Sequence, residues 1–186
     1  EELIQKTNPD TIIVATGAVE TKADMPISAN AKVVYLWDYL HGDAEVGEKV
    51  VIFGGEAVEA AASLGLEGKK VTMLQEGEGI SWPSYLFPGG ARREPLSRFL
   101  KKGKVDIRFN TTVKEIGDDK VTISVKGQEE KLDYDTVIVA IGRSRVDSLF
   151  NALKGKNREV YIIGDAKEPR ELTPASHEGY WVGRTL

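Results

Sequence analysis

The chain has 186 residues, of which 41% are hydrophobic and 29% charged, and its formal net charge at pH 7 is −4. These numbers are typical of a globular protein with one good-sized domain, or one domain with pieces of another. The negative charge argues against nucleic acid as a partner, because a nucleic-acid-binding face is usually basic. The absence of cysteine excludes disulfides, thiolate catalysis and cysteine-ligated zinc or iron–sulfur clusters within the chain.

The histidines and the apolar pattern give no sign of a metal site or a membrane segment. His41 and His177 lie far apart and form no metal-binding motif, and we expect His177 on a helix surface rather than in an acid–base role. No apolar run approaches the length of a membrane span, and the segment opening with Glu1 and Glu2 lacks the basic region of a signal peptide. We therefore expect no metal, no catalytic residue, no membrane partner and a cytoplasmic location.

The first half of the chain predicts strands that alternate with helices. β-Branched, apolar runs bounded by small residues indicate buried strands, and longer amphipathic runs indicate helices. The predicted elements are, in order, a strand at 10–17, a polar connection at 18–32, a short helix at 36–40, a strand at 50–53, a helix at 57–66 and a strand at 69–74.

The second half predicts a helix, an antiparallel meander and a return to buried strands. The meander comprises strands at 111–116, 120–125 and 129–132, separated by turns at 117–119 and 126–128. Around it lie a helix at 92–102 and strands at 105–109, 134–142 and 159–165. A short helix is predicted at 146–153 and a longer one at 173–186, with Thr173 as N-cap and Pro174 at its first position. The fold class is therefore α/β, with a parallel sheet and an antiparallel meander.

Two segments of the chain are near copies of each other. Residues 10–17 read Asp-Thr-Ile-Ile-Val-Ala-Thr-Gly, and residues 135–142 read Asp-Thr-Val-Ile-Val-Ala-Ile-Gly. Each ends a strand in a small-residue turn that allows close backbone approach. Residues 11–15 and 160–163 are further expected to be strands of one sheet.

The turn after the strand at 50–53 resembles a dinucleotide-binding loop. Gly54, Glu56 and Glu59 occupy the three glycine positions of the fingerprint G-x-G-x-x-G. The N-terminus of the following helix attracts anions, but Glu56 adds a Cβ and a negative charge where a phosphate would approach. Two unit charges about 4 Å apart repel by roughly 1–4 kcal/mol. The pattern is consistent with a weakened nucleotide loop or with a turn that binds nothing.

The end of the strand at 69–74 is where such units carry an acid that binds the adenosine ribose. Gln75 occupies that position and Glu76 follows it, so either side chain is a candidate, and an exposed pair without a ligand is the alternative. No arginine directly follows Leu74, which favours NAD or ADP over NADP. The next loop contributes three aromatic residues that either stack on an adenine or pack against the domain edge: Trp82, Tyr85 and Phe87.

Four motifs in order resemble the C-terminal region of flavoproteins with two dinucleotide-binding domains. They are Ala-Thr-Gly at 15–17, Val-Gly-Glu-Lys at 46–49 with the altered fingerprint, Ala-Ile-Gly-Arg at 140–143, and Gly-Asp-Ala at 164–166 followed by Glu-Pro-Arg at 168–170 and Glu-Gly-Tyr at 178–180. The chain is most similar to the 2,4-dienoyl-CoA reductase, 2-enoate reductase and trimethylamine dehydrogenase family. The resemblance covers nearly the whole chain.

The resemblance implies a division into three parts. Residues 1–41 and 146–186 would be remnants of an FAD-binding domain, and residues 42–145 a Rossmann-like NAD(P)-binding domain. The family's FAD fingerprint, flavin-bearing barrel and cluster cysteines have no counterpart in the 186 residues. We therefore expect a fragment whose partner is the missing upstream flavin domain of a parent protein, with FAD bound in that parent only.

The resemblance also implies a function. In the parent, hydride would pass from NADH to FAD and electrons onward to FMN, while the isolated chain would be inactive. The alternative is a non-catalytic ADP-binding or purely structural module, because the trimethylamine dehydrogenase branch has lost these glycines and holds ADP. The candidate cofactor-binding residues are Gly54, Gly55, Glu56, Gln75, Glu76, Gly142, Arg143, Ala15, Thr16, Gly17, Gly164 and Asp165, of which Asp165 would reach the ribityl chain of FAD.

Overall fold

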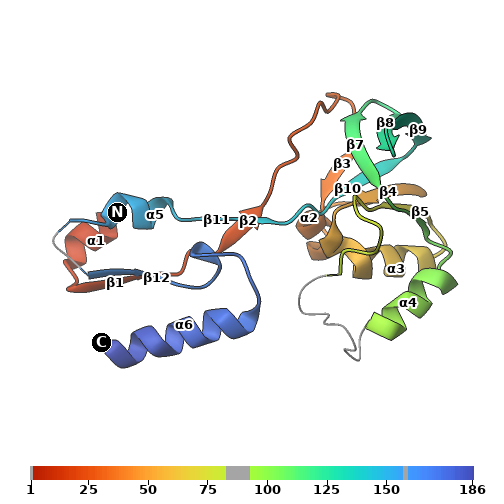
Figure 1. Cartoon of the computed structure of the whole chain (residues 1–186). Coiled ribbons are helices and arrows are strands. Elements are labelled where there is room, and N and C mark those ends of the chain that lie inside the picture. Colours follow the sequence, from red (N-terminus) through yellow and green to blue (C-terminus); the bar gives the residue numbers. More distant parts are fainter. Residues whose placement is uncertain (1, 83–92, 157–158) are drawn as a thin grey trace. The chain divides into compact units, whose positions relative to one another are not determined.

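A computed structural model describes residues 2–82, 93–156 and 159–186 of the chain (Figure 1). Its residues group into two compact units, one made of residues 1–21 and 143–186 and the other of residues 22–142. Tyr85, Phe87 and the predicted helix start at Arg92 lie outside the described residues. In the described ranges no helix has the length and apolar character needed to cross a membrane.

A five-stranded parallel sheet forms the centre of the unit of residues 22–142. Its strand order is β3-β10-β4-β5-β6, and each neighbouring pair is parallel. The strands are β3 (Val33–Tyr35), β4 (Lys49–Phe53), β5 (Lys70–Leu74), β6 (Asp106–Arg108) and β10 (Thr136–Val139). The predicted α/β fold with a parallel sheet is confirmed.

Both faces of this sheet are covered, as the continuous apolar runs of its strands require. Val50 and Ile52 of β4 pack toward one core cluster with the helix side, and Val51 and Phe53 pack toward a second cluster with the meander. The helices of this unit are α2 (Leu36–His41), the 3₁₀ turn η1 (Gly55–Ala57), α3 (Val58–Leu66) and α4 (Arg93–Lys102). The meander is β7 (Thr111–Ile116), β8 (Lys120–Val125) and β9 (Gln128–Asp133), antiparallel as predicted. Figure 1 shows it on the opposite side of the sheet from α3 and α4.

Two glycines allow α3 to approach the end of α4 closely. A Cβ added at Gly65 would lie 2.8 Å from the Gly103 carbonyl oxygen, and one added at Gly103 would lie 2.7 Å from the Gly65 carbonyl carbon. The backbones therefore meet where a larger side chain at either position would force them apart.

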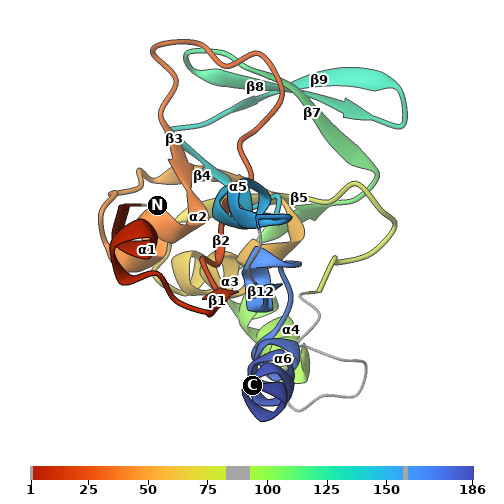
Figure 2. The same cartoon turned by 90° about the vertical axis from the view of Figure 1, so that its left-hand side faces the viewer.

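The described residues of the unit of residues 1–21 and 143–186 form two small sheets and four helical segments, most of which are labelled in Figure 2. Strand β1 (Thr11–Val14) pairs in parallel with β12 (Glu159–Ile162), which confirms the expectation that these segments share a sheet. Strand β2 (Ala18–Glu20) pairs antiparallel with β11 (Arg143–Arg145). The helical segments are α1 (Glu2–Thr7), α5 (Ser148–Leu153), the 3₁₀ turn η2 (Gly164–Ala166) and α6 (Leu172–Thr185).

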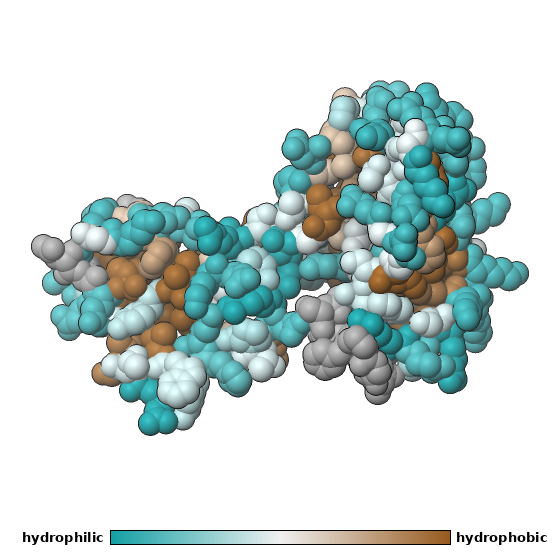
Figure 3. All heavy atoms as spheres, in the orientation of Figure 1, coloured by the Kyte–Doolittle hydropathy of each residue, from teal (hydrophilic) through white to brown (hydrophobic). Residues whose placement is uncertain are grey.

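The core of this second unit is small. Its core cluster consists of Ile12, Val14 and Leu153; Ala166 of η2 is also buried, and none of the residues of α6 is buried. Figure 3 shows hydrophobic patches on the visible face of the unit. Its exposed large apolar residues include Ile13, Leu172, Tyr180 and Trp181.

Sequence-based prediction was wrong for several short elements. Helix α6 begins at Leu172 with Glu171 as its N-cap, so Thr173 is not the cap and Pro174 is the third helical residue. The first-turn N–H groups of a helix have no partner within the helix, and proline is tolerated there. Four α-helices and strands of the described residues were not predicted, namely α1, β2, β3 and β11, and β2 lies in the predicted polar connection.

Candidate functional site

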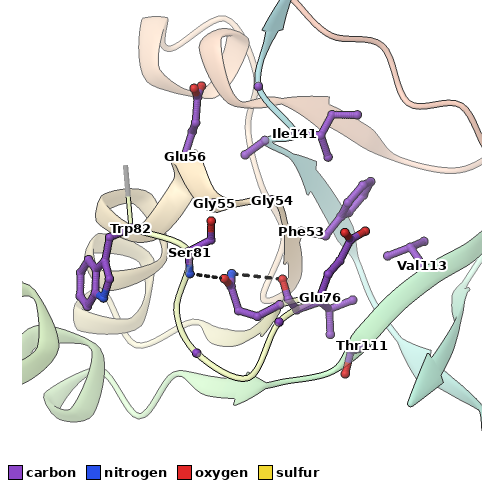
Figure 4. Close-up of a pocket in the computed structure, with 16 residues that line it drawn as sticks. Phe53, Gly54, Gly55, Glu56, Glu76, Ser81, Trp82, Thr111, Val113 and Ile141 are labelled. Atoms are coloured by element: carbon purple, nitrogen blue, oxygen red, sulfur yellow. Dashed lines mark hydrogen bonds between the residues drawn. The ribbon is translucent and has the colours of Figure 1, made fainter. Parts of the chain in front are cut away.

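A pocket of about 640 Å³ opens at the carboxyl ends of β4 and β5 (Figure 4). Ligands of open parallel α/β sheets bind at this edge. Its walls come from residues 53–56 at the end of β4, residues 74–77, 79, 81 and 82 after β5, Thr111 and Val113 of β7, and residues 140–142 after β10. All of these residues belong to the unit of residues 22–142.

Gly54 begins the turn because no other residue fits there. Its φ is +108°, and a Cβ would lie 1.9 Å from the carbonyl oxygen of Ala140 and 2.8 Å from the Ile141 nitrogen. The turn after β4 thus passes directly over the end of β10, which places Gly142 on the same pocket wall.

Glu56 stands at the N-terminal end of the helical segment that leads into α3. It belongs to the 3₁₀ turn η1, and Glu59 lies in the first turn of α3. Both positions suit a carboxylate because a helix N-terminus carries partial positive charge. Figure 4 shows the Glu56 side chain pointing away from Ser81 and Glu76. That Glu56 weakens phosphate binding stays a prediction.

Gln75 is turned into the protein, and only 2% of its surface is exposed. Its Nε2 donates a hydrogen bond to the Leu74 carbonyl oxygen at 3.2 Å, and its Oε1 accepts one from the Ser81 backbone N–H at 2.7 Å (Figure 4). The alternative of an exposed pair is therefore wrong for Gln75, whereas Glu76 is exposed and lines the pocket.

Ser81 and Trp82 close one side of the pocket. A Cβ added at Gly55 would lie 2.7 Å from Ser81 Oγ and 2.9 Å from both its Cβ and its carbonyl oxygen. Trp82 packs against the core cluster that contains α3, with the Arg93 guanidinium 5.4 Å from its ring centroid. Trp82 therefore packs against the edge of the domain, as predicted, and also lines the pocket.

The remaining candidate residues lie in the other unit, namely Ala15, Thr16, Gly17, Arg143, Gly164 and Asp165. Asp165 Oδ2 accepts a hydrogen bond from Arg143 Nη1 at 2.5 Å, and its Oδ1 accepts one from the Arg170 N–H at 3.0 Å. The hydroxyl of Thr16 donates to the carbonyl oxygen of Val146. These contacts hold the Gly-Asp turn and the Ala-Thr-Gly turn in place within the unit.

Glu178 of α6 completes the network around the Gly-Asp turn. Its carboxylate accepts hydrogen bonds from the Gly164 N–H at 2.8 Å, Lys167 Nζ at 3.0 Å and Arg170 Nη2 at 2.5 Å. The hydrogen bond from Arg170 contributes most to lowering the pKa of Glu178 from 4.5 to about 2. The carboxylate is thus ionised throughout the physiological range, and it ties α6 to η2.

The described ranges contain no cluster of three or more histidine, cysteine, aspartate or glutamate side chains that could hold a metal. His177 is exposed on α6, as expected. Sequence reasoning missed several pocket residues, chiefly Ser81, Thr111 and Val113. The position of Thr111 and Val113 at the start of a predicted strand was the one signal available, and nothing in the sequence marked Ser81.

Comparison with known proteins identifies similar chains over nearly the whole length. The family model described as pyridine nucleotide-disulphide oxidoreductase matches residues 4–179. A metal reductase of Desulforamulus reducens is 30% identical over 95% of the chain, and a cinnamate reductase of Clostridium sporogenes is 27% identical over 100%. The chain covers 30% and 28% of these two relatives, which is less than a third of their length.

Solved structures give the same picture. A 2-naphthoyl-CoA reductase complex matches all of the chain with a TM-score of 0.82 and 32% identity, and the chain covers 28% of it. Histamine dehydrogenase from Rhizobium sp. 4-9 matches with a TM-score of 0.84 at 21% identity, with the chain covering 30% of it, which shows a shared fold.

Proposed function

The chain belongs to the pyridine nucleotide-disulphide oxidoreductase family, and we propose that it is the nucleotide-binding region of an NAD(P)H-dependent flavin oxidoreductase of the enoate or dienoyl-CoA reductase type. The observation that carries this proposal is the pocket beside Gly54 at the carboxyl edge of the parallel sheet. Similar chains named as cinnamate, bilirubin and 2-naphthoyl-CoA reductases support it. The whole protein would take enoate or dienoyl thioester-type substrates.

We assign the pocket to an NAD(P)-binding-like domain, expected from the sequence at residues 42–145, and the flanks at 1–41 and 146–186 to portions of an FAD domain. The compact unit that contains the pocket has different bounds, residues 22–142, because β3 belongs to its parallel sheet. All pocket residues fall within 53–142, which supports the first assignment. In a longer protein, FAD would accept hydride from the nicotinamide of NADH. The residues Gly164 and Asp165 are our candidates for contact with FAD, together with residues 15–17 and Arg143. We further propose an upstream flavin domain as partner and the cytoplasm as location.

FAD and NAD(P) binding is a property of the family, but we propose that this chain holds NAD or ADP weakly. Glutamates replace glycine at positions 56 and 59, and Gln75 directs its polar atoms to its own backbone surroundings. Glu76 is the exposed polar group left at the end of β5. Its carboxylate would repel a 2′-phosphate, so NAD and ADP are preferred over NADP.

A second candidate is a non-catalytic ADP-binding or purely structural module. The contact of Ser81 with Gly55 favours it, because the loop after β5 fills space beside the turn that a diphosphate would need. In this case the chain would keep the fold and contribute no hydride transfer.

Calorimetric titration of the 186-residue chain with NADH and with ADP tests the proposal. We expect dissociation constants of about 100 μM or weaker, and Glu56→Gly combined with Glu59→Gly should tighten binding about tenfold or more. The reason is that each removed repulsion of about 1.4 kcal/mol corresponds to a factor of ten. The control is Glu67→Gly, which removes a carboxylate from the other end of α3.

Three outcomes separate the candidates. Low-micromolar NADH binding by the native chain contradicts the weakened loop. Tighter binding only in the double variant supports it. No binding by either chain favours the structural module.

A further inference from the structure

The dinucleotide fingerprint does not require glycine at position 55. In G-x-G-x-x-G the second position accepts any residue, and the φ of Gly55 lies outside the left-handed region. The structure supplies a different reason for glycine, because Ser81 Oγ, Cβ and the carbonyl oxygen lie 2.7–2.9 Å from the place of a Cβ. Glycine at position 55 therefore leaves room for Ser81, and the loop after β5 packs against this first residue of the turn that leads into α3.

One buried side chain holds this loop. Gln75 is 2% exposed, and its Oε1 accepts the Ser81 N–H at 2.7 Å while its Nε2 donates to the Leu74 carbonyl oxygen. The amide is thus anchored on β5 at one end and holds Ser81 at the other. Gln75 occupies the position where related units carry the acid that binds the adenosine ribose. Its Oε1 would be the acceptor for a ribose hydroxyl, but it accepts the Ser81 N–H instead.

We propose that Gln75 is a positioning residue that holds Ser81 on Gly55, so that Ser81 and the diphosphate of an adenine nucleotide compete for the turn leading into α3. The proposal rests on the nucleotide site proposed above and deepens it. Free N–H groups at a helix N-terminus bind phosphate, and a loop seated beside them restricts the approach of a ligand. Weak binding of NADH and ADP then has two causes. One is the pair of glutamates, and the other is the position of Ser81 beside Gly55, which a ligand can reverse by displacing the loop.

The experiment titrates the 186-residue chain with ADP by calorimetry. Gln75→Leu keeps the size of the side chain but cannot accept the Ser81 N–H, and we expect it to bind ADP about three- to tenfold more tightly than the native chain. Ser81→Gly is a second, independent variant, because it removes the two side-chain atoms beside Gly55 while keeping the backbone N–H that Gln75 holds, and we expect a change in the same direction. Gln128→Leu makes the same chemical change at an exposed position of β9 and serves as the control.

Hydrogen exchange separates positioning from a general loss of structure. The Ser81 amide should be protected in the native chain and in Gln128→Leu, and it should exchange faster in Gln75→Leu. Saturating ADP should likewise accelerate exchange at Ser81 in the native chain, because ligand and loop exclude each other. A merely structural role of Gln75 would lower the melting temperature without raising ADP affinity.

Two results would overturn the proposal, and they differ in whether the proposed nucleotide site fails as well. If the native chain binds ADP and neither Gln75→Leu nor Ser81→Gly binds it more tightly, the competition is absent while the nucleotide site stands. If no chain, including both variants, binds ADP at millimolar concentration, both the competition and the proposed nucleotide site fail.

Discussion

Two adjacent glycines at the turn after β4, Gly54 and Gly55, each allow the close approach of a different residue. The first passes over Ala140 in a backbone conformation that only glycine adopts easily, and the second receives Ser81. The sequence could predict the turn at Gly54, because a glycine directly after a buried strand fits the fingerprint. It could not predict that Gln75 faces inward, because its partner is a backbone N–H of a loop with no sequence signature.

Gly54→Ala should destabilise the unit of residues 22–142 by about 3 kcal/mol or more, through the clash with the Ala140 carbonyl and the unfavourable φ. Gly68→Ala is the matched control. Gly68 also has a positive φ, +92°, but nothing lies within 4 Å of its Cβ position, so strain alone should cost about 1–2 kcal/mol. Urea unfolding measures both. Equal losses would show that the close approach to β10 contributes nothing.

Among the elements, α6 depends on polar contacts rather than on a buried face. None of its residues is buried, and Glu178 joins it to η2 through Gly164, Lys167 and Arg170. The short strands β2, β3 and β11 form because each pairs with a strand that is distant in the sequence. Three residues carry too little periodicity to be predicted, whereas the six-residue strands β7 and β8 were predicted at their observed bounds.

The pKa of Glu178, lowered from 4.5 to about 2 mainly by its hydrogen bond from Arg170, predicts a pH-dependent stability. A carboxyl whose folded pKa lies below its unfolded value stabilises the fold above about pH 4.5, and that contribution is lost as the pH falls toward 2. Glu178→Gln should therefore reduce stability by about 1.5–3 kcal/mol at pH 7, and the difference should shrink below about pH 4.5 and vanish below about pH 2. Urea unfolding at a series of pH values measures this. Glu159→Gln, at an exposed position of β12, is the control, and a deficit that stays constant down to pH 2 would contradict the assignment.

At the scale of the whole chain, the near-identical segments 10–17 and 135–142 form strands in different settings. β10 lies between β3 and β4 and is buried at all four positions, whereas β1 has β12 as its one partner among the described strands and is buried at alternate positions. Their sequences predict strands of the same kind. Burial depends on whether both faces of the strand are covered: β10 packs against one cluster on each face, and β1 is buried on one face only. That coverage depends on the topology rather than on the eight residues themselves. The fold class was therefore predictable from the sequence, but the unequal cores of the two units were not.

This difference gives a test that uses the same substitution twice. Ile138 of β10 is 0% exposed and Ile13 at the equivalent position of β1 is 44% exposed. Ile138→Ala should cost about 2–5 kcal/mol because it leaves a cavity in a covered sheet, whereas Ile13→Ala should cost less than about 1 kcal/mol. Urea unfolding gives the free energies, and hydrogen exchange of the strand amides assigns each loss to its own unit. A loss at Ile13 equal to that at Ile138 would mean that β1 is covered in solution by a surface outside its unit.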